Sequence, residues 1–235
     1  MRILAGVAML VFAGFHAPPT GPRPPAPGTG RIVGKVVLST AVTSRKMRFR
    51  LYTDPGPAAE PKASSDGSEM GNVVIYLDSV DTSSPRARHR TMAQRDETFE
   101  PHVVAVERGS TLEFLNDDPF FHNVFSLSGP KSFDLGRFPR GQAKTVRFDR
   151  TGVVKVFCHI HADMSAIVVV VPNPYFTSPD STGQFELPDV PPGEYRVVAW
   201  HERTKAVVGR VRVTGGNTAS IDFNIPVARD VALKD

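Results

Sequence analysis

The sequence predicts an all-β protein, and three observations support this fold class. Short runs rich in β-branched and aromatic residues recur between residues 30 and 228, separated by turns rich in Gly, Pro and Asp. No stretch of the sequence shows the long amphipathic periodicity of a surface helix. Hydrophobic residues make up 40% of the 235 residues, which is enough for a packed core in one or two domains. Antiparallel sandwiches or barrels are the architectures that this pattern favours.

The composition also excludes several classes of protein. The 19 Gly and 21 Pro residues show no collagen-like repeat, and the hydrophobic content is too high for a fully disordered chain. A formal net charge of +4 arises from charges of both signs spread along the chain, which does not indicate a nucleic-acid partner. The only long apolar run is N-terminal, so a membrane-embedded bundle is excluded.

Residues 1–17 resemble a signal peptide or an N-terminal anchor. Arg2 supplies a positive end, and the apolar run from Ile3 to Phe15 is shorter than the roughly 20 residues of a membrane-spanning helix. The sequence does not decide whether this segment is cleaved. Residues 18–29 are rich in Pro and predict an extended linker. We therefore expect a protein exported to the periplasm or secreted, without a transmembrane domain beyond the N-terminal anchor.

The remaining chain is predicted to form strands in a regular order. Residues 31–38 and 72–77 are β-branched and aromatic runs, and residues 53–71 between them form a loop poor in apolar side chains. Further predicted strands cover residues 111–115, 145–148, 153–158, 166–171, 208–213 and 220–225.

One cysteine, Cys158, stands in a segment with the residue types of a metal site. A single cysteine cannot form a disulfide within the chain, which leaves a free thiol, a nucleophile, an interchain partner or a metal ligand. His161 and Met164 follow at intervals of three residues, and His122 lies upstream at the end of another strand. Two imidazoles, a thiolate and a thioether are the donor set of a trigonal copper site with a weak axial sulfur ligand.

The segment around residues 90–172 resembles a cupredoxin, and its short ligand loop is similar to that of the amicyanin-like members. The resemblance rests on the Asp-Pro-Phe-Phe-His-Asn motif ending at Asn123 and on the segment from Cys158 to Met164. It implies a Greek-key sandwich holding one copper ion that cycles between Cu(I) and Cu(II), with His122, Cys158, His161 and Met164 as ligands. It also implies that Asn123 tethers the ligand loop and donates a backbone hydrogen bond to the cysteine sulfur.

Apolar residues near the ligand positions indicate how electrons could leave the site. We expect an apolar rim around an exposed edge of His161, which would serve for docking and electron exit and consists of Phe120, Phe121, Phe138, Pro139 and Ile160. Core packing is the alternative role for some of these side chains. The implied partners are redox proteins, with a dehydrogenase as donor and a c-type cytochrome as acceptor, as in methylamine-utilization systems.

Three other histidines are interpreted separately. His159 follows Cys158 directly, so its side chain is expected to point away from the cysteine, toward solvent. His102 has no ligand-spaced partner and is predicted to be structural. His89 lies in a basic turn, with a docking site for an acidic partner as the alternative.

A second resemblance covers the rest of the chain. Residues 182–200, with a Gly turn, a strand, a Pro-Pro-Gly turn and an aromatic-led strand, look like the carboxypeptidase regulatory-like domain, a smaller transthyretin-like β-sandwich. Residues 30–37 match the opening strand of that family. This implies a discontinuous sandwich made of residues 30–85 and 173–228, into which the copper module of residues 90–172 is inserted. The alternative is one enlarged cupredoxin followed by a C-terminal module.

The sequence thus predicts an exported blue (type 1) copper protein that carries single electrons by outer-sphere transfer and is not an enzyme. A copper carrier, storage protein or sensor without a redox role could use the same ligands. A hydrolytic metalloenzyme would need an open coordination position and a positioned acid or base, for which only Asp163 and His159 lie nearby. A purely structural module with a vestigial metal loop is opposed by the complete ligand set.

Overall fold

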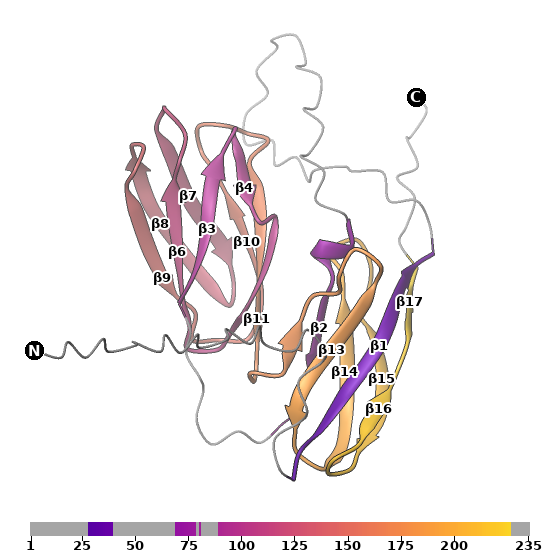
Figure 1. The fold of residues 1–235 in the computed structure, drawn as a ribbon. Helices are drawn as coiled ribbons and strands as arrows, with labels where there is room; N and C mark the ends of the chain where they lie inside the picture. The colour runs from indigo at the N-terminus through magenta and orange to yellow at the C-terminus, as the bar shows by residue number, and fades with distance from the viewer. Residues whose placement is uncertain (1–27, 40–68, 79, 81–88, 227–235) are drawn as a thin grey trace, which may run out of the picture.

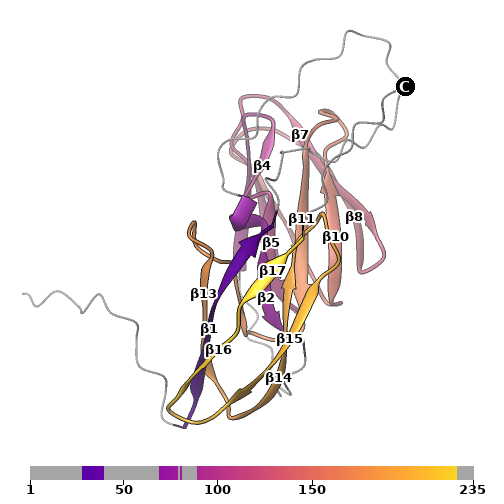
Figure 2. The same ribbon diagram turned by 90° about the vertical axis from the view of Figure 1, so that its right-hand side faces the viewer.

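The computed structural model describes residues 28–39, 69–78, 80 and 89–226, and these residues form two β-sandwiches that lie side by side (Figure 1). The predicted all-β fold is confirmed. The signal or anchor segment, most of the Pro-rich linker and nearly all of the loop at 53–71 lie outside the described residues. Figure 2 shows that the strands of both sandwiches run in broadly similar directions. Within the described part of the chain, no helix has the length and apolar character needed to cross a membrane.

The first sandwich, which we call the β3–β11 sandwich, consists of two sheets. One has the strand order β5-β11-β10-β7-β8, and the other has the order β4-β3-β6-β9. Strands β3 and β6 pair in parallel, as do β5 and β11, whereas the other neighbours are antiparallel. The strand bounds are β3 His89–Arg95, β4 Thr98–Glu100, β5 Val103–Glu107, β6 Thr111–Asn116, β7 His122–Ser128, β8 Lys131–Phe138, β9 Ala143–Arg147, β10 Gly152–Phe157 and β11 Ser165–Val171.

Alternation along the strands fills the core of this sandwich. Leu112 and Phe114 of β6 face Val154 and Val156 of β10 across the core, and Cys158 continues the inward row of β10. All five side chains are buried. Cys158 therefore points into the core of this sandwich.

The second sandwich, which we call the flanking sandwich, combines strands from both ends of the described chain. One sheet has the order β13-β1-β16, with β17 also paired to β1, and the other has the order β12-β2-β14-β15. The element bounds are β1 Gly30–Leu38, η1 Glu69–Asn72, β2 Val74–Leu77, β12 Phe176–Thr177, β13 Gln184–Val190, β14 Gly193–Trp200, β15 Val207–Val213, β16 Thr218–Ser220 and β17 Phe223–Ile225.

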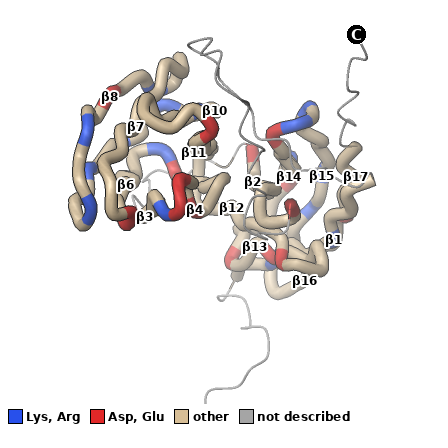
Figure 3. Tube along the Cα trace, turned by 90° about the horizontal axis from the view of Figure 1, so that it is seen from above, with Lys and Arg blue, Asp and Glu red and all other residues tan. Residues whose placement is uncertain are grey.

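Strand β11 contacts the cores on both of its sides. Ala166, Val168 and Val170 point into the β3–β11 sandwich. Ile167 and Val169 point the other way, into an apolar cluster shared with β2 of the flanking sandwich. Figure 3, seen from above, shows β11 on the side of its sandwich that faces β2 and β12.

Candidate metal centre

Four side chains named by the sequence gather around one end of the β3–β11 sandwich. His122 is the first residue of β7, and Cys158 follows the last residue of β10. His161 and Met164 lie in the loop that leads into β11. This loop is short because β10 and β11 are antiparallel neighbours, with Phe157 directly opposite Ser165.

Three donor atoms of these side chains form a compact cluster. The Nδ1 atoms of His122 and His161 lie 3.0 Å apart. The sulfur of Cys158 lies 3.9 Å from Nδ1 of His122 and 4.0 Å from Nδ1 of His161. His122, Cys158 and His161 are the group of candidate metal-binding side chains among the described residues, with all ligand atoms within 4.8 Å of one another.

These distances fit a single metal ion. Bonds of about 2.05 Å to nitrogen and about 2.3 Å to sulfur allow two nitrogens on one ion to lie up to about 4.1 Å apart, and a nitrogen and a sulfur up to about 4.4 Å apart. Each of the three distances above is below its limit, so one ion can contact all three atoms without movement of the loop.

Asp118 fixes the orientation of the His122 ring. Its carboxylate accepts hydrogen bonds from the backbone N–H groups of Asp96 at 2.7 Å and Glu97 at 3.0 Å, and from Nε2 of His122 at 2.7 Å. Because a carboxylate only accepts, Nε2 of His122 carries the proton and Nδ1 presents its lone pair to the cluster. Burial alone would raise the pKa of Asp118, but these donors outweigh it and the pKa is lowered.

Asn116 shapes the loop that delivers both Asp118 and His122. Its side-chain amide donates to the carbonyl oxygens of Phe120 at 2.8 Å and Phe138 at 2.9 Å, and its oxygen accepts from the backbone N–H of Asp118 at 2.9 Å. The side chain is fully buried. Neither Asn116 nor Asp118 was predicted as a site residue. The sequence feature that could have identified Asp118 is a carboxylate four residues before a candidate ligand histidine.

Asn123 contacts the ligand loop through its side chain. Its Oδ1 accepts from the backbone N–H of His159 at 3.4 Å, and its amide donates to Asp134 at 2.7 Å. The hydrogen bond that the structure gives the cysteine sulfur comes from a different backbone group, the N–H of Ile160, at 3.4 Å. That bond arises within the ligand loop itself.

Met164 closes the loop from inside the sandwich. Its side chain is 1% exposed and belongs to the main core. Its N–H donates to the carbonyl of His161 at 3.1 Å, and its carbonyl accepts from the N–H of Cys158 at 3.3 Å. The backbone of the loop is thus fixed at both ends of the ligand segment, while His161 remains partly exposed. Burial, followed by the neighbouring His122, lowers the pKa of His161.

The surface beside His161 is an apolar rim with a basic residue. Phe120, Phe121 and Ile160 are 39%, 54% and 38% exposed, and with Arg137 and His161 they line a hollow of about 400 Å³. The ring of Phe120 lies 5.4 Å from that of His161.

The expected rim contained two further residues, and Phe138 does not belong to it. Phe138 is 0% exposed and packs in the core, so it cannot contact a partner. Pro139 is only partly exposed. Asp163 lies on the exposed part of the ligand loop.

Three other described histidines, His159, His89 and His102, do not belong to the three-atom cluster. His159 is exposed, as expected, and its ring stacks on Phe125 with the centroids 3.7 Å apart. His89 is exposed at the start of β3, with Nε2 3.7 Å from a carboxylate oxygen of Glu113. His102 is partly buried between the two sandwiches and hydrogen-bonded through both ring nitrogens.

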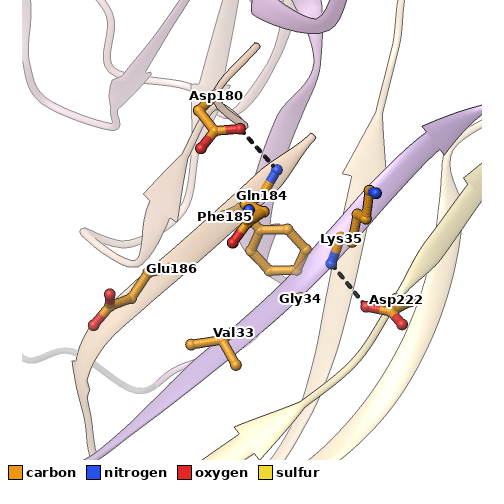
Figure 4. Close-up of a pocket in the computed structure, with 8 residues that line it drawn as sticks. All are labelled: Val33, Gly34, Lys35, Asp180, Gln184, Phe185, Glu186 and Asp222. Atoms are coloured by element: carbon orange, nitrogen blue, oxygen red, sulfur yellow. Dashed lines mark hydrogen bonds between the residues drawn. The ribbon is translucent and has the colours of Figure 1, made fainter. Parts of the chain in front are cut away.

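A second hollow, of about 540 Å³, lies on the flanking sandwich (Figure 4). Its acidic side chains are engaged within the protein. Asp180 accepts from the backbone N–H of Gln184 at 3.0 Å, and Asp222 accepts from that of Lys35 at 2.7 Å. Glu186 forms an ion pair with an arginine of β1 at 3.5 Å. These bonds stabilise turns and strand ends around the groove, and we assign no binding role to it.

Comparison with known proteins gives partial likenesses. No protein-family model matches the chain. Pseudoazurin of Methylorubrum extorquens is 33% identical over 75 residues, which are 31% of this chain and 50% of the relative, so the chain spans about half the length of the curated relative it matches.

Three solved structures are similar to about two fifths of the chain or less. A purple cupredoxin from Nitrosopumilus maritimus is 22% identical, with a TM-score of 0.32, covering 34% of this chain and 98% of that one. Amicyanin from Paracoccus versutus is 21% identical, with a TM-score of 0.33, covering 41% and 96%. A copper-containing nitrite reductase from Thermus scotoductus is 24% identical, with a TM-score of 0.34, covering 40% and 25%.

The β3–β11 sandwich holds the candidate metal centre. It is one of the two sandwiches, and it carries the His, Cys and His cluster at one end. The likeness to pseudoazurin supports a cupredoxin fold within the chain.

Proposed function

We propose that this protein binds one copper ion through His122, Cys158, His161 and Met164 and carries single electrons between redox proteins by outer-sphere transfer. The observation that carries the proposal is the cluster of one sulfur and two imidazole nitrogens within 4.8 Å at one end of a sandwich. Copper bound by such donors would alternate between Cu(I) and Cu(II). The likeness to pseudoazurin supports the same assignment.

The protein holds these donors in a fixed arrangement. Asp118 holds His122, Asn123 holds the loop at His159, and the backbone of Met164 bonds to both His161 and Cys158. Since the ligand atoms are already close together, little rearrangement is needed when the charge of a bound ion changes. Such preorganisation favours fast electron transfer.

The apolar rim of Phe120, Phe121 and Ile160 supports His161 as the point of electron exit. Exposed aromatic and aliphatic side chains around a partly exposed ligand suit brief docking through a small interface. A dehydrogenase donor and a c-type cytochrome acceptor are the proposed partners. Export through residues 1–17 is the proposed route to them.

We also propose that residues 30–85 and 173–228 form one discontinuous domain of the carboxypeptidase regulatory-like type, with residues 90–172 inserted as the copper module. The sheets support this division, because β1 pairs with β13, β16 and β17, and β2 shares a sheet with β12, β14 and β15. Strands β3–β11 pair among themselves. Insertion is tolerated where the ends of the inserted domain lie close together.

The decisive experiment is copper titration of the full chain with an absorption spectrum and a voltammogram. The proposal predicts one equivalent of copper, an intense thiolate-to-copper band in the visible and a reversible one-electron couple. Cys158→Ser should abolish the band. A colourless Cu(II) adduct would contradict the proposal, and rapid loss of copper to chelators without a reversible couple would favour a copper carrier instead.

A further inference from the structure

The two sandwiches meet through an apolar contact that ends beside the ligand loop. Val103 and Ala105 of β5 and Ile167 and Val169 of β11 pack against Val74 of β2. All five are buried. The partly buried side chains that join them are Tyr76, Val153, Phe176 and Trp200. Because β11 begins directly after Met164, the flanking sandwich lies against the strand that leaves the proposed copper site.

At the edge of this contact, His102 connects the flanking sandwich with the end of the ligand loop. Its Nε2 lies 3.1 Å from Oε1 of Glu202, which belongs to the turn between β14 and β15. Its Nδ1 lies 3.1 Å from the carbonyl oxygen of Ser165, and its own carbonyl accepts from the N–H of Ile167 at 2.8 Å. His102 therefore holds the backbone on both sides of residue 166.

Both ring nitrogens of His102 face acceptors. A carbonyl oxygen and a carboxylate only accept, so protonation of both ring nitrogens satisfies both contacts. Burial opposes this charge, but Glu202 and the Ser165 carbonyl outweigh it and the pKa of His102 is raised. The Glu202 side chain is only 11% exposed, which strengthens its interaction with the ring.

The turn that carries Glu202 is itself anchored within the flanking sandwich. The guanidinium of Arg203 pairs with the carboxylate of Glu69 from η1. The N–H of Arg203 donates to Nδ1 of His201 at 3.3 Å, and the His201 side chain is fully buried. Glu202 is thus presented to His102 from a fixed position rather than from a free loop.

We propose that Glu202 and His102 are positioning residues for the copper site: Glu202 of the flanking sandwich fixes His102, and His102 fixes Ser165, the residue that follows Met164. This inference rests on the proposed function. The flanking sandwich then has a role in the site, because Ser165 directly follows Met164 in the chain. The N–H and C=O of Met164 form the two backbone hydrogen bonds that close the ligand loop.

The test compares Glu202→Gln with Glu194→Gln in the full chain. Glu202→Gln removes the charge and retains the size of the side chain. Glu194 is a matched control on the same sandwich, because its carboxylate is exposed and pairs with Arg212 at the surface. We expect Glu202→Gln to weaken copper affinity about tenfold, at the lower end of the effect of removing an outer partner of a ligand. It should also shift the reduction potential and the visible spectrum, while Glu194→Gln leaves all three unchanged.

A second variant separates positioning from general stability. In His102→Asn, the amide can still donate to the Ser165 carbonyl but no longer reaches Glu202. We expect copper affinity closer to the wild-type value than in His102→Ala, and no further effect of Glu202→Gln in the His102→Asn background. If Glu202→Gln lowers only the melting temperature and leaves affinity, potential and spectrum equal to those of Glu194→Gln, the inference is wrong.

The apoprotein provides a readout that does not depend on copper. Amide hydrogen exchange at Met164 and Cys158 reports the two backbone bonds that close the ligand loop. We expect faster exchange at both amides in Glu202→Gln and unchanged exchange in Glu194→Gln. Equal exchange in the two variants would refute the positioning role even in a blue copper protein, whereas a wild-type protein without the visible band would refute the proposed function separately.

Discussion

Replacing Asp118 by Asn should separate the orientation of His122 from the stability of the fold. Asn retains only one acceptor oxygen for the three N–H donors that the two carboxylate oxygens of Asp118 serve, and its amide nitrogen donates instead of accepting. Even where the amide oxygen keeps the bond from Nε2 of His122, that acceptor is uncharged and the bond is weaker. His122 is therefore held less firmly with Nδ1 toward Cys158 and His161.

The magnitude follows from these contacts. At least one of the backbone N–H groups of Asp96 and Glu97 loses its acceptor, which costs about 1–3 kcal/mol of folding free energy. Because the ring of His122 loses its charged partner, copper affinity should fall about 10- to 100-fold, as for other outer partners of metal ligands. The loss in metal affinity should therefore be evident even where the apoprotein remains folded.

The assay is a competition titration with a copper chelator, run beside urea unfolding of the apoprotein. Asp117→Asn is the control, since Asp117 is the adjacent carboxylate and is paired with Arg95 at the surface, where its side chain is 37% exposed. It should change copper affinity little. Unchanged affinity in Asp118→Asn would show that the orientation of His122 is not set by this carboxylate.

Three further predictions concern the surface and the flanking sandwich. Phe121→Asp should slow electron self-exchange of the copper-loaded protein, measured by stopped flow or NMR line broadening, without changing its spectrum. Leu127→Asp is the control, because this side chain is 72% exposed and lies away from the rim, and it should leave the rate unchanged. Equal rates in the two variants would show that the rim is not part of the docking surface. Gly34→Ala should lower the free energy of unfolding by about 1–3 kcal/mol because its Cβ would collide with the Ile221 carbonyl, while Gly71→Ala, with open space around the added atom, should not. Burial alone would raise the pKa of Glu69, but His201 and Arg203 outweigh it and lower the pKa below its usual value of 4.5. The stabilising effect of this carboxylate is therefore present above pH about 4.5 and is lost as the pH falls through the folded-state pKa. The stability difference between wild type and Glu69→Gln in urea melts should shrink below that pH, and a difference that grows on acidification would contradict this sign.

The ligand loop could be proposed from the sequence because its geometry is local. Cys158, His161 and Met164 lie within one turn between two antiparallel strands, so their spacing alone brings them together. His122 could be added because its motif has a recognisable order. Asp118 was not predicted as a site residue because an Asp before Pro is also typical of an ordinary turn. Its contact with His122 depends on the fold of residues 116–122.

The mistake at Phe138 has a physical cause in the register of β8. Phe133 and Leu135 turn toward the core, so strict alternation would place residue 138 outside. In β7, Asn123 and Phe125 are separated by one residue, but their partners in β8, Arg137 and Asp134, are separated by two. The extra residue forms a bulge, in which Gly136 adopts a φ of 65°. The bulge switches the face of the strand and turns Phe138 inward.

Several strands were also missed because their patterns are weak. In β3, Met92 and Gln94 are the buried residues, among mostly polar neighbours. Its pairing with β6 is parallel and long-range, which no local pattern reveals. The contact between His102 and Glu202 is likewise set by the packing of one sandwich on the other.

The burial of β11 on both faces bears on how the molecule comes apart. Val168 and Val170 contribute to one apolar core, and Ile167 and Val169 to the next, so neither sandwich can lose its structure without exposing side chains of a strand that the other requires. Global unfolding should therefore be a single cooperative transition, in which metal release and the melting of the flanking sandwich coincide.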